Sequence, residues 1–337
     1  MIVADYIVKR LENHGVNHIF LIVGGTAMYL NDAVFKQNKI TYICNHHEQA
    51  STMAAECYAR ITGGLGVVIV TSGAGMTNTI TGLIGAWWDS IPVLVLSGNA
   101  RSSLLTYKRP NLRQLGVQDT RIVDIVKPIT KYAVCVDDIK YVDYHLEKAI
   151  YLALHGRQGP VWLDIPLDIE ATEIGRKKLV KFVPPKKKRA SLTNDVNKTL
   201  QYLKKSKSPI IIVGSGIRSS GSFDLFHKVL DKLRIPVLTS LTAQDVMYED
   251  HPFYGGRFGP YGTKNGNYLV EQADCMLILG SRLYLWQIGY DYKNFGKNAF
   301  KIMVDIDKEE LDKPTLHTNL PIHADVKDFL EEMDRQV

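Results

Sequence analysis

The residues with the clearest capacity for chemistry lie in four short segments, each directly after an apolar run. They combine glycines, hydroxyl and amide side chains and one carboxylate, which together can bind a polar ligand and share a proton with it. If the apolar runs are parallel strands, their ends meet at one edge of a sheet, where open α/β folds bind ligands. The segments are residues 23–26 (VGGT), 45–48 (NHHE), 71–78 (TSGAGMTN) and 97–120 (SGN and a long polar stretch).

Glu48 is the candidate acid–base residue, because it opens a helical pattern over 48–62. A carboxylate in a first turn commonly stabilises the helix. Burial would instead raise its pKa and make it a proton donor, and the residue pattern leaves both interpretations open. His46 and His47 do not predict a metal site, since neighbouring helical residues point apart. Ser51 stands four residues after His47, where a HExxH motif needs histidine.

Two glycine-rich turns and one polar loop are the candidate binding segments. Gly24 and Gly25 allow close approach of the backbone to a ligand, or form a tight turn only. The second turn offers Thr71, Gly73, Gly75 and Asn78, but it is neither a P-loop nor a complete GxGxxG motif. The long polar stretch 101–120, which includes Gln118, is typical of a functional loop inside a compact domain.

Short apolar runs alternate with helical patterns on both sides of a basic segment. Runs at 18–23, 40–44, 66–71, 92–97 and 159–165 predict strands of a buried parallel sheet, and the pattern restarts at 209–213, 236–239, 275–279 and 301–305. We therefore predict two doubly wound α/β domains of the Rossmann or flavodoxin type. The predicted boundaries are 1–172 and 191–337, joined by a linker over 173–190.

Composition excludes several classes of protein. The 337 residues carry 41 Lys and Arg against 35 Asp and Glu, a net charge of +6. Eight of the basic residues lie in the run 176–189, so the rest of the chain is slightly acidic and predicts no nucleic-acid partner. No apolar run has the ~18 residues of a membrane helix. The four cysteines form no CxxC pair, and a reducing, cytoplasmic location fits best.

In order and spacing, these segments resemble thiamine-diphosphate enzymes of the acetolactate synthase (acetohydroxyacid synthase) type. The first domain resembles the family's pyrimidine-binding domain through LIVGGTAMYL, HHEQASTMAAECYARITG, VVIVTSGAGMTNTITGLIGAWWDSIPVLVLSG, QDTRIVDIVKPITKYA and ALHGRQGPVWLDIPLDI. The second resembles its middle domain through IIIVGSGIRSSG, LTSLTAQDVMYEDHPFYGG, ADCMLILGSRL and IMVDID. The resemblance implies a fold of this type and decarboxylation of pyruvate followed by carboligation.

The resemblance also implies roles for single residues. Glu48 matches the glutamate that hydrogen-bonds N1′ of the cofactor's aminopyrimidine, and it is the expected catalytic residue. Gln118 matches the glutamine of the substrate-side loop. The expected cofactor-binding positions are Gly24, Gly25, Thr71, Gly73, Gly75 and Asn78. The family's sites lie between two chains, which implies a dimer.

Two departures from the family pattern bear on activity. Val117 stands where anabolic acetolactate synthases often have phenylalanine, and 112–119 with 126–133 look more like enzymes of surface-sugar biosynthesis that pass the two-carbon unit to a keto-sugar. The family binds the diphosphate through Mg²⁺ with a GDG motif in a third domain, and the sequence contains no GDG. We therefore expect this chain to supply no metal ligand and to need a C-terminal domain or partner chain.

Other functions stay open at this point. A 2-oxo acid decarboxylase or oxidase of the same family would share this half of the site, and a non-catalytic binding or assembly module would keep only the fold. In the second domain, Gly214 and Gly216 suggest a nucleotide turn, but Ser219 replaces the third glycine of the NAD motif. Some relatives hold FAD in this domain, where Arg282 could face a phosphate.

Overall fold

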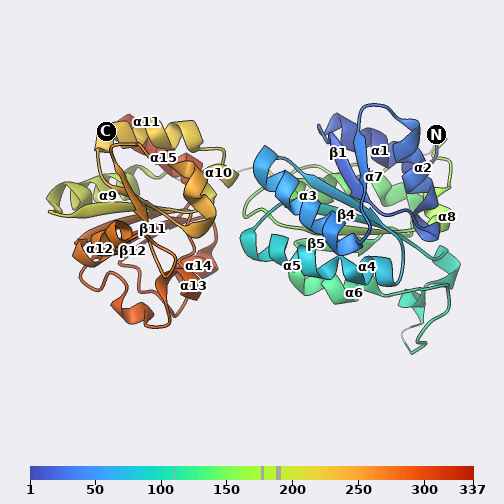
Figure 1. The fold of residues 1–337 in the computed structure, drawn as a ribbon. Coiled ribbons are helices and arrows are strands. Elements are labelled where there is room, and N and C mark those ends of the chain that lie inside the picture. The colour runs from blue at the N-terminus through green and yellow to red at the C-terminus, as the bar shows by residue number, and fades with distance from the viewer. Residues whose placement is uncertain (110, 176–177, 187–190) are drawn as a thin grey trace. The chain divides into compact units, whose positions relative to one another are not determined.

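The computed structural model describes residues 1–109, 111–175, 178–186 and 191–337. The chain divides into two compact units, Met1–Lys186 and Lys187–Val337. Each unit is an α/β layer structure built on its own sheet (Figure 1). The basic run predicted at 176–189 lies partly outside the described residues.

Within its described residues, unit 1 forms a six-stranded parallel sheet in the order β2-β1-β3-β4-β6-β5. The central strands β3 and β4 are buried along their whole length, in keeping with their apolar runs VVIV and VLVL. The edge strand β2 is exposed throughout. The strands are β1 (His18–Leu21), β2 (Thr41–Cys44), β3 (Gly66–Val70), β4 (Val93–Asn99), β5 (Tyr132–Cys135) and β6 (Val161–Pro166).

Helices cover both faces of this sheet. One core joins α1, α2 and α7 to one face, and a second core joins α3, α4, α5 and α6 to the other. Thus each strand presents alternate side chains to two helical layers. The helices are α1 (Val3–Asn13), α2 (Met28–Lys36), α3 (Glu48–Thr62), α4 (Ala74–Asn78), α5 (Ile80–Asp89), α6 (Ile122–Val126), α7 (Val142–Leu154) and α8 (Leu167–Glu170). Short 3₁₀ turns are η1 (Gly25–Ala27), η2 (Ser102–Leu104), η3 (Thr106–Lys108), η4 (Lys127–Ile129) and η5 (Ile139–Tyr141).

Unit 2 repeats the architecture with a parallel sheet in the order β12-β11-β10-β7-β8-β9. Helices α9, α11 and α15 pack on one face and α12, α13 and α14 on the other. The strands are β7 (Pro209–Val213), β8 (Val237–Thr239), β9 (Tyr254–Arg257), β10 (Cys275–Leu279), β11 (Phe300–Asp305) and β12 (Leu320–His323). The helices are α9 (Thr193–Lys205), α10 (Gly216–Ser219), α11 (Phe223–Leu233), α12 (Lys264–Gln272), α13 (Leu285–Ile288), α14 (Lys308–Leu311) and α15 (Val326–Gln336), with 3₁₀ turns η6 (Leu241–Val246) and η7 (Tyr292–Asn294).

Part of the segment predicted as a linker packs against unit 1. The backbone N–H of Val180 donates to the carbonyl of Lys140 at 2.9 Å. The ammonium of Lys181 lies 3.1 Å from the buried carboxylate of Asp143 on α7. The ring of Phe182 contacts Tyr144 at a centroid distance of 5.8 Å. These contacts hold residues 180–182 on α7, so this part of the segment does not run free through solvent.

The two parallel sheets with helices on both faces confirm the predicted fold class. The strand predicted at 209–213 and the helix predicted at 48–62 have the observed bounds. After β3 the chain forms two helices, α4 and α5, which meet at Thr79. None of the helices in the described parts of the chain combines the length and apolar character that crossing a bilayer requires.

Candidate functional site

Glu48 is the first residue of α3 and follows the edge strand β2. The residue before it, His47, is extended, and its Nδ1 accepts a hydrogen bond from the backbone N–H of Gln49 at 3.1 Å. His47 is therefore the N-cap of the helix and satisfies one of the free N–H groups of its first turn. The side chain of Glu48 is partly buried. His47 therefore has a structural role as the helix cap, and Glu48 is the acid of this segment.

A hydrogen bond ties Glu48 to the glycine-rich turn. The side-chain amide of Asn78, at the end of α4, donates to Glu48 Oε2 at 3.0 Å. A bond to a carboxylate is worth about 1.5–3 kcal/mol and fixes the orientation of the carboxyl plane. Glu48 Oε1 accepts no hydrogen bond from any residue that the structure describes. One oxygen is thus held by the protein and the other is free to meet a ligand.

Gly75 brings the glycine-rich turn close to the free oxygen. A β-carbon at position 75 would lie 3.4 Å from Glu48 Oε1 and 2.9 Å from Thr71 Cγ2. The second distance is shorter than a van der Waals contact allows, so any larger residue would displace Thr71 or the helix. Glycine therefore lets the turn pack against Thr71 while it lies beside the carboxylate. This unpaired oxygen beside a glycine is the feature that fits the aminopyrimidine of the predicted cofactor.

Thr26 joins three strand ends through its hydroxyl. Its Oγ1 donates to the carbonyl of Gly98 at 3.0 Å and accepts from the backbone N–H of Ser72 at 2.8 Å. Because its single proton is already committed, the 2.8 Å contact with Thr71 Oγ1 places the donor on Thr71. A β-carbon on Gly24 would lie 2.3 Å from Thr71 Cβ, so only glycine allows this approach. Gly25 borders open space.

The polar loop that carries Gln118 meets the same turn at Gly73. A β-carbon on Gly73 would lie 2.8 Å from Gln118 Cβ, and Gly73 has φ +68° and ψ −124°, which favours glycine. Gln118 itself has φ +54°, a conformation that costs a residue with a side chain about 1–2 kcal/mol. The surrounding contacts must offset that cost. The loop therefore holds Gln118 against the glycine-rich turn.

The predicted site residues form one connected cluster. Glu48, Gly75 and Asn78 meet at one point, Thr71 and Gly24 adjoin them, and Gly73 contacts Gln118. Gly25 belongs to the cluster by sequence alone. Thr26 and Gly98 belong to two of the segments singled out from the sequence, but they were not named as site residues. A β-carbon at position 98 would lie 2.0 Å from the carbonyl oxygen of Thr26.

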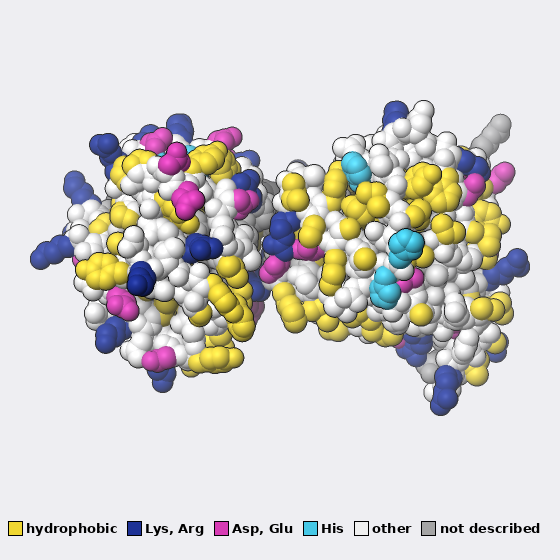
Figure 2. All heavy atoms as spheres, viewed as in Figure 1, with side chains coloured by type: hydrophobic (Ala, Val, Ile, Leu, Met, Phe, Trp, Pro, Cys, Tyr) yellow, Lys and Arg dark blue, Asp and Glu magenta, His cyan; other side chains and the backbone are white. Residues whose placement is uncertain are grey.

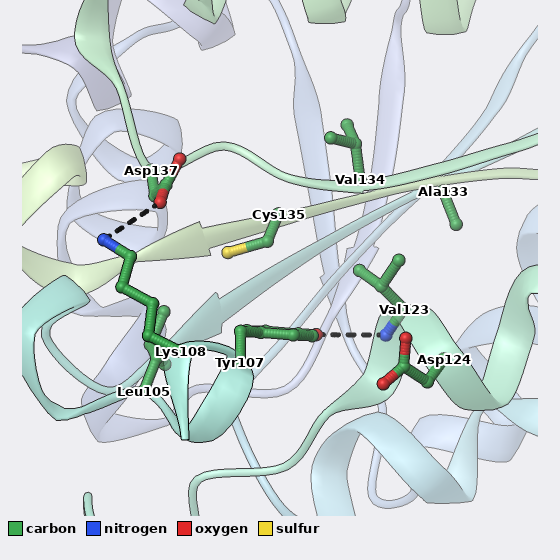
Figure 3. Close-up of a pocket in the computed structure, with 9 residues that line it drawn as sticks. All are labelled: Leu105, Tyr107, Lys108, Val123, Asp124, Ala133, Val134, Cys135 and Asp137. Atoms are coloured by element: carbon green, nitrogen blue, oxygen red, sulfur yellow. Dashed lines mark hydrogen bonds and ion pairs between the residues drawn. The ribbon is translucent and has the colours of Figure 1, made fainter. Parts of the chain in front are cut away.

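A cavity lies elsewhere, at the carboxyl end of the edge strand β5 (Figure 3). Its volume is about 260 Å³, and Tyr107 and Lys108 of η3 face Cys135 across it. Lys108 pairs with Asp137 at 3.3 Å, and Tyr107 Oη accepts from the N–H of Val123 at 3.1 Å. Burial raises the pKa of the Cys135 thiol, so the cavity offers no thiolate. Glu48 does not line it.

The nucleotide-like turn of unit 2 has a packing explanation. A β-carbon on Gly214 would lie 2.2 Å from the carbonyl oxygen of Gly280, and one on Gly216 would lie 2.6 Å from Gly280 Cα. The backbone N–H of Gly216 also donates to Gly280 O at 3.0 Å. These glycines therefore let two strand ends touch. Among the described residues, no group of three His, Cys, Asp or Glu side chains is placed to hold a metal ion.

Comparison with known proteins assigns both units. The family model of the thiamine pyrophosphate enzyme, N-terminal TPP binding domain, matches residues 1–148, and that of the thiamine pyrophosphate enzyme, central domain, matches residues 196–333. The chain belongs to the thiamine pyrophosphate enzyme family. The first match contains the whole cluster from Gly24 to Gln118, which makes the cluster part of a domain of the type that binds thiamine diphosphate.

Similar proteins carry the name of acetolactate synthase large subunit. The chain is 34% identical over 338 residues to the one from Buchnera aphidicola subsp. Schizaphis graminum and 34% identical over 334 residues to that of Lactococcus lactis. It is 31% identical to the acetolactate synthase isozyme 3 large subunit of Escherichia coli. These alignments include 98% of this chain and 56–57% of each relative. The chain thus spans little more than half the length of these relatives.

Proposed function

We propose that this chain supplies the half of a thiamine diphosphate site that activates the aminopyrimidine, in an acetolactate synthase-type carboligase. The observation that carries the proposal is the Glu48 cluster, in which one carboxylate oxygen is held by Asn78 and the other lies beside Gly75. Bound thiamine diphosphate supplies a carbon nucleophile for the 2-oxo group of pyruvate. The residues of this chain bind and orient it and manage its protons.

Glu48 acts on the ring nitrogen of the aminopyrimidine. Its Oε1 is the free acceptor of the site or, when protonated, the donor. The hydrogen bond from Asn78 to Oε2 fixes the orientation of the carboxyl group. A carboxyl group placed against a ring nitrogen can share one proton with it. Glu48 is therefore the proposed catalytic residue.

The glycine-rich turn and the threonine network give the ring a fixed wall. Gly75 allows Thr71 to pack against the turn, and Thr71 is itself held by its contacts with Thr26 and Gly24. Since Thr26 also binds Gly98, three strand ends are held at fixed separations. A preorganised site of this kind loses little conformational entropy when the ligand binds. The network explains why hydroxyl residues, and not aliphatic ones, follow two of these strands.

Gln118 is proposed to face the 2-oxo acid or the acceptor. It lies against Gly73 of the glycine-rich turn. Its side-chain amide can bond a carbonyl or carboxylate oxygen. The names of the similar proteins favour pyruvate as donor and a second 2-oxo acid as acceptor. Val117, which is exposed, adjoins Gln118 and contributes to acceptor choice in this proposal.

The diphosphate and its Mg²⁺ are assigned to a GDG-bearing polypeptide, either a continuation of this chain or a separate one. The described residues group no carboxylates for a metal, and the printed sequence contains no GDG. FAD in unit 2 stays a prediction, and there Arg282 lies 3.9 Å from Glu310 and 5.2 Å from the ring of Tyr284. A cytoplasmic location also stays a prediction.

We propose further that a second copy covers the face of unit 1 that carries α3. Figure 2 shows hydrophobic side chains gathered around histidines on that face. At the β2 edge, the ring of Tyr42 packs against that of Phe35 of α2 in a tilted arrangement, at a centroid distance of 4.6 Å, although both are exposed. Exposed apolar area of this kind marks an interaction surface. The exposed large hydrophobic side chains of α2, β2, α3 and α5 include Phe35, Tyr42, Ile43, Met53, Ile61 and Trp88.

A reconstitution experiment tests the proposed function. The chain is mixed with thiamine diphosphate, Mg²⁺, pyruvate and the GDG-bearing polypeptide, and pyruvate loss is followed. We expect turnover that Glu48→Gln abolishes and Glu56→Gln preserves, because Glu56 lies on the same helix but pairs with Arg60. Absence of turnover in every mixture, together with no thiamine diphosphate-linked rise in melting temperature, would favour a binding module.

A further inference from the structure

The loop that carries Gln118 is closed by hydrogen bonds at both ends. Near its start, the backbone N–H of Thr106 donates to Oδ2 of Asp119 at 2.9 Å. At its end, the carbonyl of Thr120 accepts from the side-chain amide of Asn99 at 3.3 Å. Asp119 and Thr120 directly follow Gln118, so these two bonds fix the backbone on which Gln118 takes its left-handed conformation.

Both ends of the loop are connected to one buried carboxylate, that of Asp164 on β6. The connecting residues are Tyr107, which follows Thr106, and Asn99, which bonds Thr120. The Oδ2 of Asp164 accepts from the Asn99 amide at 2.8 Å and from Tyr107 Oη at 3.4 Å. Its Oδ1 accepts from Ser97 Oγ at 2.7 Å, and that hydroxyl in turn accepts from Trp162 Nε1 at 2.8 Å. Asp164 is fully buried, as are Ser97 and Asn99. Three side chains thus donate to the Asp164 carboxylate, and Trp162 donates to one of them.

The contacts at position 164 match an ionised carboxylate. A carboxylate accepts at both oxygens, whereas an amide would turn an N–H₂ group toward either Asn99 or Ser97. Asn99 is the branch point, because the same Nδ2 also reaches Thr120 at the end of the loop. Tyr107 is the second branch, because its hydroxyl also accepts from the N–H of Val123, beyond the loop. Nothing in the chemistry at Glu48 needs Asp164.

The geometry points to Asp164 as a positioning residue that, through Asn99 and Tyr107, holds the 101–120 loop so that Gln118 stays against Gly73. This inference rests on the proposed function for the role of Gln118 in turnover. The tie between Asp164 and the loop stands on the hydrogen bonds alone. Asp164 touches neither ligand nor reacting atom, so its effect on turnover must pass through Gln118.

Hydrogen exchange of the whole chain tests the tie. Asp164→Asn is expected to raise amide exchange in peptides from 101–120 by about tenfold, the equivalent of one lost bond to a charged group, and to leave β3 and α3 unchanged. Tyr107→Phe keeps the ring and removes only the hydroxyl, so it should give a smaller rise in the same peptides. Glu170→Gln is the matched control, because Glu170 is equally buried but bonds the N–H of Leu30 outside the loop.

A uniform rise across the sheet, or no rise in 101–120 with either loop variant, would overturn the inference. The reconstituted enzyme gives the second test. Asp164→Asn and Gln118→Ala should raise the KM for pyruvate similarly, and the double variant should show no further rise. Additive effects would contradict positioning through Gln118. Failure of the wild-type mixture to turn over would count against the proposed function, while the exchange result would still decide the tie.

Discussion

The side-chain amide of Asn78 donates to Oε2 of Glu48 at 3.0 Å, across thirty residues of sequence. The bond joins the start of α3, which follows an edge strand, to the end of α4, which follows a central strand. It leaves the other carboxylate oxygen beside Gly75, where a β-carbon would lie 3.4 Å from it. One amide thereby sets the direction in which the proposed catalytic acid points.

Removing this amide should weaken the site more than the fold. We expect Asn78→Ala to lower the free energy of unfolding by about 1 kcal/mol, because both partners are only partly buried. The thiamine diphosphate-linked rise in melting temperature of the reconstituted enzyme should fall at the same time. Asn197→Ala, on the exposed side of α9, is the control and should leave that rise intact. An unchanged rise in Asn78→Ala would show that Glu48 needs no orienting partner.

A methyl group at position 75 should block the cofactor. In Gly75→Ala the new carbon meets Thr71 Cγ2 at 2.9 Å, and overpacking of this kind costs about 1–3 kcal/mol. Gly85→Ala on α5 borders open space and should stabilise the helix by up to about 1 kcal/mol. Calorimetric titration with thiamine diphosphate in the reconstituted enzyme should then show loss of binding in the first variant only. Equal binding by both would refute this role for Gly75.

The buried strands, α3 and the glycine turns could be predicted because the residues within each segment determine its structure. Buried strands such as β3 are continuous apolar runs, and α3 has a cap, an apolar stripe and a terminal Gly63 in left-handed conformation. The glycines at 24, 73 and 75 were recognisable because they follow strands directly. Their actual partners, Thr71 and Gln118, are set by tertiary contact and could not be read from spacing.

The missed elements lacked such local signals. Strand β5 is four residues long and half-exposed along its length, so it shows no buried apolar run. Strand β9 has the sequence YGGR, where two glycines weaken the pattern and a register shift accompanies its pairing with β8. The buried Asp164 was also missed, because its role depends on donors that come from β4 and from the loop after it.

The threonine network should be sensitive to a change that preserves shape. Thr26→Val keeps the branched side chain but leaves the N–H of Ser72 without its acceptor, which costs about 1–3 kcal/mol. Thr77→Val is the control, since Thr77 is exposed and its hydroxyl makes only long local bonds of 3.4 and 3.5 Å. Urea unfolding followed by circular dichroism measures both. Equal midpoints for the two variants would mean that the network adds nothing to stability.

Asp164 should make stability depend on pH. Complete burial raises its pKa from the ordinary 3.8 to about 7, although Asn99, Ser97 and Tyr107 donate to it, and the nearby carboxylate of Asp119 adds to the rise. Cys135 and Tyr107, which titrate at higher pH, also face it. Between pH 4 and 7 the unfolded chain has lost this proton and the folded one keeps it. Raising pH through that window therefore favours unfolding, by at most about 1.4 kcal/mol per pH unit.

The variant Asp164→Asn removes this titration. The free energy of unfolding of the wild type, measured relative to the variant, should fall as pH rises from 4 to 7 and stay level above 7. Denaturant titrations at four or five pH values measure the difference directly. Parallel curves for the two proteins across this window would show that Asp164 is ionised in the folded chain throughout.

The most direct test of the account is the rate of deuterium exchange at C2 of the cofactor's thiazolium ring, followed by NMR after acid quench. The sample is this chain with thiamine diphosphate, Mg²⁺ and the GDG-bearing polypeptide. If Glu48 shares its proton with the aminopyrimidine, Glu48→Gln should slow this exchange by about 10²–10⁴-fold, and Glu56→Gln should leave it unchanged. Exchange in Glu48→Gln at the wild-type rate would contradict the central claim.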